Sequence, residues 1–65
     1  MGSAATITIS VDISEVEALA LAQLLKRMGW QEWRGNAVDD DEAYLMRSAC
    51  GRLQEGLAQV GFSPR

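Results

Sequence analysis

The sequence contains no histidine, one cysteine and one proline among its 65 residues. Without histidine the chain lacks the commonest general base, and Cys50 has no imidazole beside it that would make it a nucleophile. One cysteine cannot form an internal disulfide, nor can it complete a zinc ligand set alone. We therefore expect no enzymatic activity and no metal or other cofactor, and we interpret Cys50 as a small core residue.

Basic residues are also scarce, with six Lys+Arg against nine Asp+Glu and a net charge of −3. This sign argues against binding to nucleic acid through its phosphates. No apolar run approaches the roughly 20 residues of a membrane span, and no basic, then apolar, signal segment begins the chain. A lone cysteine without a signal segment fits a reducing compartment, so we expect a cytoplasmic protein.

The length bounds the architecture. A chain of 65 residues forms one domain, residues 1–65, and such a domain buries only about 60% of its unfolded surface. Small domains are usually stabilised by disulfides, a metal or a partner subunit. Because the first two are excluded by composition, oligomerisation is the expected remedy.

Residues 6–13 show the clearest pattern, in which Ile7, Ile9, Val11 and Ile13 alternate with polar residues. Alternation of β-branched and polar residues predicts a half-buried strand over about 6–13. A single strand cannot satisfy its own backbone donors and acceptors. We therefore expect it to pair with the same strand of a second copy or with a strand of a partner protein.

A first helix is predicted over about 15–28. Ser14 is placed as its N-cap, with Glu17 three residues on to complete a capping box. Gly29 suits the position after the last helical residue. Apolar residues cover a broad face of this helix, broader than one helix partner requires, so we expect contacts with both the second helix and the sheet.

A second helix is predicted over about 40–60, after a connection at residues 30–38 that has room for one irregular helical turn. Asp39 is placed as its N-cap with Glu42 at the reciprocal position, and Gly61-Phe62 as its end. Its apolar positions form a narrow seam of Met46, Cys50, Leu53, Leu57 and Val60. Ala49 and Gly56 lie beside this seam, where small residues let another helix approach closely.

Together these elements predict an α+β fold, mainly α, of order β-α-α. The expected assembly is a homodimer with an intermolecular two-stranded antiparallel ribbon and two helical hairpins, held by Ile7, Ile9 and Val11. This arrangement resembles the ribbon-helix-helix repressors over residues 6–29. The resemblance implies DNA reading by the outward strand residues, which here are Thr6, Thr8, Ser10 and Asp12.

The resemblance also implies a phosphate contact at the start of the second helix. This sequence instead has four consecutive acidic residues there, Asp39, Asp40, Asp41 and Glu42, which repel phosphate. Two interpretations remain open: the carboxylates cap and stabilise the helix, or they imitate phosphate oxygens and bind the basic surface of another protein. Consecutive helical positions point in different directions, which argues against a Ca²⁺ or Mg²⁺ site.

Trp30, Trp33 and Arg34 fall within five positions of the connection. Trp and Arg are enriched at the energetic centres of protein interfaces. The alternative is that the indoles cover the open end of the helical hairpin, one buried and one partly exposed. Both interpretations place these residues at the junction of the two helices.

Short segments distributed from Glu17 to the C-terminus resemble a group of small proteins carried by phages and prophages of Pseudomonas, Burkholderia and related bacteria. These segments are residues 17–23, Lys26-Arg27 with Gly29-Trp30, residues 37–40, Glu42-Ala43-Tyr44 with Met46, and residues 61–65. Size and predicted layout more faintly resemble the phage quorum-sensing anti-activators, small dimers that bind a host transcription activator. That resemblance implies an inhibitor that acts by contact during host takeover.

The leading hypothesis is therefore a non-enzymatic, phage-encoded homodimer that binds and inhibits a host regulatory protein, with DNA-binding proteins the favoured class. Its expected partner-binding residues are Trp30, Trp33, Arg34, Asp39, Asp40, Asp41 and Glu42. The alternative is a DNA-binding transcriptional regulator of the ribbon-helix-helix type.

Overall fold

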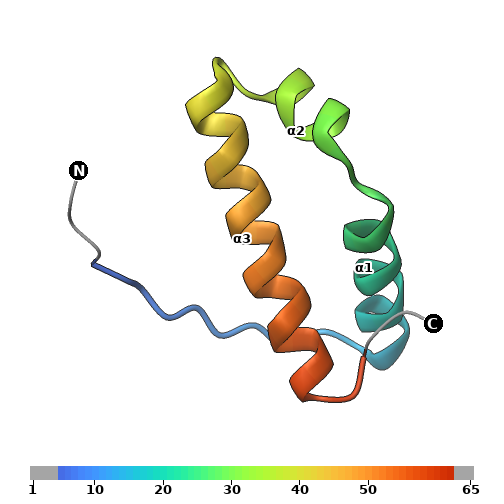
Figure 1. Ribbon diagram of the computed structural model, residues 1–65. Coiled ribbons are helices and arrows are strands. Elements are labelled where there is room, and N and C mark those ends of the chain that lie inside the picture. Colours follow the sequence, from blue (N-terminus) through green and yellow to red (C-terminus); the bar gives the residue numbers. More distant parts are fainter. Residues whose placement is uncertain (1–4, 63–65) are drawn as a thin grey trace.

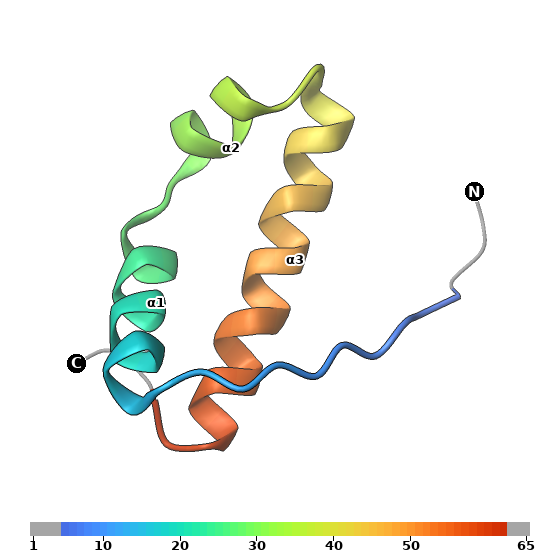
Figure 2. The same ribbon diagram turned by 180° about the vertical axis from the view of Figure 1, so that it is seen from behind.

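The computed structural model describes residues 5–62, which contain three helices: α1 (Glu15–Arg27), α2 (Trp30–Asn36) and α3 (Asp40–Gln59). Helices α1 and α3 lie side by side, and the short α2 joins them at one end (Figures 1 and 2). The extended N-terminal segment (residues 5–13) leaves from the opposite end, where α1 begins and α3 finishes. The molecule therefore has two distinct ends, a helical corner and an open base.

The β-α-α prediction is wrong. Among residues 5–62 the structure contains no strand, and residues 6–13 make no hydrogen bond with the described part of the chain. Side-chain alternation predicts extended backbone, and the backbone is extended, but a strand exists only where a neighbouring ladder accepts and donates its hydrogen bonds. The fold is therefore mainly α, and neither a sheet nor an intermolecular ribbon is supported.

Helix α1 begins as its sequence predicts and ends one residue earlier. Ser14 Oγ accepts a hydrogen bond from the backbone N–H of Glu17 at 3.1 Å, and Glu17 Oε1 accepts one from the N–H of Ser14 at 2.8 Å. Met28 is the C-cap in an extended conformation. Gly29 does not close α1 in the left-handed region: its φ is −130°, and it is the N-cap of α2.

Residues 30–36, predicted as part of a connection, form the helix α2 of seven residues. The carboxylate of Glu32 accepts a hydrogen bond from the N–H of Gly29 at 2.6 Å, which satisfies a donor at the helix start. At the other end, Asn36 Nδ2 donates to the carbonyl of Glu32 at 2.8 Å. Local side-chain hydrogen bonds therefore hold a helix that is too short to be stable by itself.

Helix α3 begins at the predicted cap and ends within one residue of the predicted end. Asp39 Oδ1 accepts a hydrogen bond from the N–H of Glu42 at 2.9 Å. The carboxylate of Glu42 in turn accepts one from the N–H of Val38, and not from that of Asp39. At the other end Gly61 has φ 96°, and the N–H of Phe62 donates to the carbonyl of Leu57 at 2.8 Å. These bonds form the glycine-terminated motif that was predicted.

Side-chain burial is much lower than the apolar pattern predicts. The buried residues of the described chain are Ala18, Ala22, Leu25 and Ala43. The broad apolar face expected on α1 is largely exposed: Val16 is 74% and Leu24 56% accessible. Helices α1 and α2 both pack against α3, through small residues that bring the backbones close while burying little area. No helix among residues 5–62 has the length and hydropathy to cross a membrane.

Candidate functional site

The α2 corner brings together the interface residues predicted in the connection and at the start of α3. Trp30 and Tyr44 stack across the junction, with ring centroids 4.8 Å apart and planes inclined at 42°. Trp30 is 39% and Tyr44 56% accessible, so one face of the aromatic pair remains open to solvent. Tyr44 was not among the predicted residues, although its place one turn into α3 puts it opposite α2.

Arg34 ties α2 to the beginning of α3. Its Nε donates to Asp40 Oδ1 at 2.6 Å, and a terminal guanidinium N–H donates to the carbonyl of Ala37 at 3.2 Å. An arginine held at two points keeps little rotamer freedom, so its remaining donors are presented in a fixed orientation. Arg34 therefore has a structural role, and any partner contact that it makes is added to that role.

Trp33 lies on the inner side of the corner and is half-buried. Its Nε1 is shielded from solvent and has no hydrogen-bond partner among the described residues. A buried indole N–H without an acceptor costs roughly 1–3 kcal/mol. Trp33 is therefore the more buried of the two indoles, and Trp30 is the more exposed.

The acidic run (residues 39–42) has structural roles at three of its four positions. Asp39 caps α3, Glu42 accepts from the N–H of Val38, and Asp40 pairs with Arg34. The carboxylate of Asp41 makes no hydrogen bond or ion pair with residues 5–62. Capping is therefore part of the answer, and Asp41 is the carboxylate whose presence the local structure does not explain. No cluster of acidic or cysteine residues in the described chain fits a metal ion.

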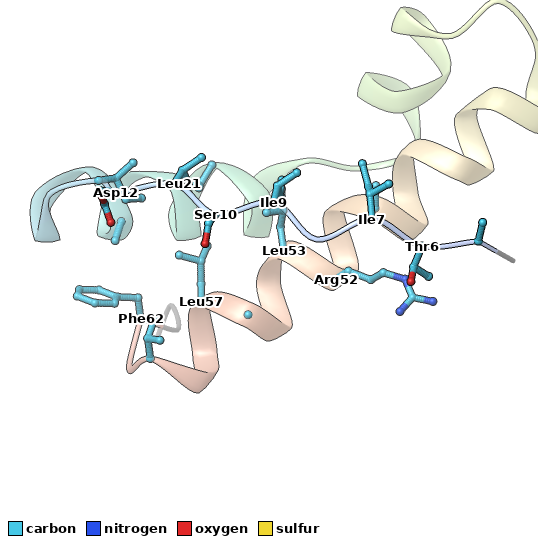
Figure 3. A pocket seen from close by; sticks show the side chains of 17 residues that line it. Thr6, Ile7, Ile9, Ser10, Asp12, Leu21, Arg52, Leu53, Leu57 and Phe62 are labelled. Carbon is cyan, nitrogen blue, oxygen red and sulfur yellow. The ribbon is translucent and has the colours of Figure 1, made fainter.

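The base of the molecule holds an open groove of about 1130 Å³ between the N-terminal segment, α1 and the second half of α3. Figure 3 shows Ile7 and Ile9 on one edge of the segment and Thr6 and Ser10 on the other. The helical wall and floor are formed by Ala18, Leu21, Ala49, Arg52, Leu53, Gly56, Leu57, Val60 and Phe62. Most of these side chains are apolar, so the groove is an exposed hydrophobic surface.

The residues predicted to hold a dimer are among the most exposed apolar side chains of this region. Ile7 is 87%, Ile9 70% and Val11 74% accessible. The predicted close-approach positions Ala49 and Gly56 both line the groove. A Cβ added at Gly56 would meet no atom within 4 Å. The sequence therefore predicted that Ala49 and Gly56 lie on a surface open to close approach, and in the structure this surface is part of the groove.

The chain was compared with protein families, curated proteins and solved structures. Residues 1–65 match a family described as a family of unknown function, DUF7706. No curated protein and no solved structure matches the chain.

Proposed function

Because the chain belongs to a family of unknown function, we propose from its surfaces that it is a non-enzymatic protein that inhibits a regulatory protein by contact. The observation that supports this function best is the α2 corner. There an exposed aromatic pair, Trp30 with Tyr44, lies on the same helical junction as the acidic run. Aromatic residues and arginine are enriched at the centre of protein interfaces, and a polar rim surrounds that centre.

The rigidity of the corner supports a role in binding. The Arg34–Asp40 and Asp39–Glu42 hydrogen bonds hold α2 and the start of α3 in one arrangement. A surface that is already ordered loses less conformational entropy when a partner binds. The corner can therefore gain affinity from a small contact area, which suits a chain of 65 residues.

The charge of the corner favours a basic partner. Asp40 keeps 70% of its side chain accessible although it pairs with Arg34, and Asp41 has no ion pair with the residues that the structure describes, 5–62. Carboxylates on a rigid helix start can occupy the surface that another protein uses for DNA phosphates. We propose that the target is a DNA-binding regulator of a bacterial host and that the chain is carried by a phage or prophage. The resemblance to phage proteins supports the second part.

The ribbon-helix-helix alternative receives no such support. Its DNA-reading element is a paired strand, and residues 5–62 contain no strand. A second function is therefore not proposed.

The proposal is tested by affinity capture from host lysate with three full-length baits: wild type, Asp41→Lys and Glu55→Lys. Asp41 and Glu55 lie on the same helix, and Glu55 is an exposed carboxylate far from the corner, so the two variants have the same net charge. We expect wild type and Glu55→Lys to retain a DNA-binding protein that Asp41→Lys loses. Rim charge changes act chiefly on association rate and salt dependence.

Direct binding to the purified target then tests the aromatic pair and the mimicry. Trp30→Ala should weaken binding by about 2 kcal/mol, as expected for a central anchor, and the target's operator DNA should compete with wild type. Equal capture by all three baits would show that the acidic run does not contact the target. Binding that DNA leaves unchanged would contradict inhibition at the DNA-binding surface.

A further inference from the structure

The groove at the base is an apolar surface that nothing in the described chain covers. Leu53 and Leu57 of α3 form its wall, and the N-terminal segment runs beside this wall with its polar edge turned toward it, so that Ile7 and Ile9 point away (Figure 3). In a stable monomer the apolar edge would be folded onto the wall, yet Ile7 is 87% and Val11 74% accessible. Two complementary apolar surfaces of one chain thus remain exposed at the same end of the molecule.

The total accessible surface indicates how much area is left uncovered. A folded monomer of 7.1 kDa exposes on average about 4,100 Å², whereas this chain exposes 5469 Å². Each subunit of an obligate homodimer buries about 1,000 Å² or more, and among the described residues the exposed side chains of Ile7, Ile9 and Val11 contribute to the excess. The buried core of the described residues is three alanines and Leu25, which is little to stabilise a monomer.

We infer that the groove is the homodimer interface of this protein: the apolar edge of residues 5–13 in each copy packs on the α3 wall of a second copy. The interaction is made by side chains entering the groove and requires no β-ladder. It lies at the opposite end from the α2 corner and goes beyond the proposed function.

Two properties of the groove favour a second copy as its occupant. The segment and the wall belong to the same chain, so a two-fold axis covers both surfaces of both copies at once. The ends of the groove also carry opposite charges: Arg52 lies beside Thr6, and Asp12 lies at the other end of the segment (Figure 3). A two-fold axis perpendicular to the segment reverses the direction of the second segment, and in that arrangement its Asp12 comes toward Arg52 of the first copy.

Gly56 provides the sharpest test. A side chain at this position meets only open space in the monomer, so Gly56→Glu should leave the fold intact and obstruct a second copy. Gly51→Glu is the matched control, because Gly51 is in the same helix, is also open to a Cβ and does not line the groove. A second pair is Ile9→Asp with Thr8→Asp, two neighbours on opposite edges of the segment, of which only Ile9 lines the groove.

Sedimentation equilibrium of the full chain at micromolar concentration should give twice the 7.1 kDa of one chain for wild type and for both controls. Gly56→Glu and Ile9→Asp should each lower the association constant of the dimer by about a hundredfold or more. The effect is large because each substitution is present in both copies and so disturbs two symmetry-related contacts. Helical circular dichroism that matches wild type would show that both variants are folded.

Isotope-filtered NOE spectra of a half-labelled dimer identify the contacting groups. We expect intermolecular contacts from the Ile7 and Ile9 methyl groups to those of Leu53 and Leu57. A monomeric wild type, a dimer that persists in both groove variants, or a dimer whose two segments contact only each other would overturn the inference. A monomer would leave the α2 corner proposal unaffected, so the two can fail separately.

Discussion

The two ends of this small molecule stabilise their backbones in different ways. At the α2 corner, residues 29–42 are held by local hydrogen bonds among Glu32, Arg34, Asp39, Asp40 and Glu42 and their neighbours. At the base, residues 6–13 are extended, without hydrogen bonds to the described chain, next to an uncovered apolar groove. Polar side chains complete the corner within one chain, whereas the base has apolar surfaces that only additional contacts can bury. The backbone of the corner is therefore held by contacts within the chain, whereas the apolar surface of the base stays exposed.

The largest expected contrast comes from adding bulk at each end. Ala43 is fully buried at the corner, and Ala49 is exposed in the groove. Ala43→Leu should lower the free energy of unfolding by about 2–3 kcal/mol because a packed site cannot accept three more carbons. Ala49→Leu should change it by less than about 0.5 kcal/mol. Urea unfolding in an Ile9→Asp background would compare them without dimerisation, and equal losses would mean that the groove is already packed.

The next contrast concerns the glycine that ends α3 at the base. Gly61 has φ 96°, a conformation that disfavours a Cβ, so Gly61→Ala should cost about 1 kcal/mol. Gly56→Ala, inside the same helix with open space at its Cβ position, should stabilise by about 0.5–1 kcal/mol. Thermal unfolding of both variants measures the difference in their free energies of unfolding. If Gly61→Ala stabilised the protein, residue 61 would not need the left-handed conformation at this helix end.

A smaller effect is expected for the tie between α2 and α3. Arg34 and Asp40 are joined at 2.6 Å, but their side chains are 42% and 70% accessible, so solvent screens the pair. A double-mutant cycle with Arg34→Ala and Asp40→Ala should give a coupling free energy of about 0.5–1 kcal/mol. Because the pair is exposed, the coupling should diminish in 1 M salt. A coupling that salt leaves unchanged would contradict an ionic contribution.

The smallest effect is a pH dependence at the start of α1. Hydrogen bonds from the backbone and side chain of Ser14 hold the pKa of Glu17 below its ordinary value of 4.5. The unfolded chain therefore binds a proton more readily, so this stabilisation is present above pH 4.5 and is lost as the pH falls through the lowered folded pKa. Glu17→Gln should flatten the stability profile across this window. Glu15→Gln is the control, because the Glu15 side chain accepts no hydrogen bond from Ser14 or from any other residue among 5–62.

Helix boundaries were predictable wherever a local side chain determines them. Ser14 with Glu17, Asp39 with Glu42, and Gly61 with Phe62 all act within four residues of the chain, and all three ends lie at or within one residue of their predicted places. Helix α2 was anticipated only as an irregular turn within a connection, because a helix of seven residues has too few apolar repeats to show a period. Its signal was the capping contact of Glu32 with Gly29, which is visible in the sequence as spacing alone.

The candidate site was predictable in part for the same reason. Trp30, Trp33, Arg34 and the acidic run are close in sequence, so a short helix and a turn suffice to bring them together at one corner. Tyr44 was missed because its contact with Trp30 depends on the angle at which α2 meets α3. The groove was missed because it combines residues 5–13 with residues more than thirty-five positions later, and no local pattern specifies that proximity.

By itself the sequence determined where α1 and α3 begin, where α3 ends, and that residues 6–13 would be extended. These properties depend on contacts within one turn or on the local residue pattern. Only the tertiary structure decided that the extended segment is not a strand, since a hydrogen-bonded ladder needs a second segment at the right distance. It also decided which apolar residues are covered, and it left the most regular apolar pattern of the chain exposed at its base.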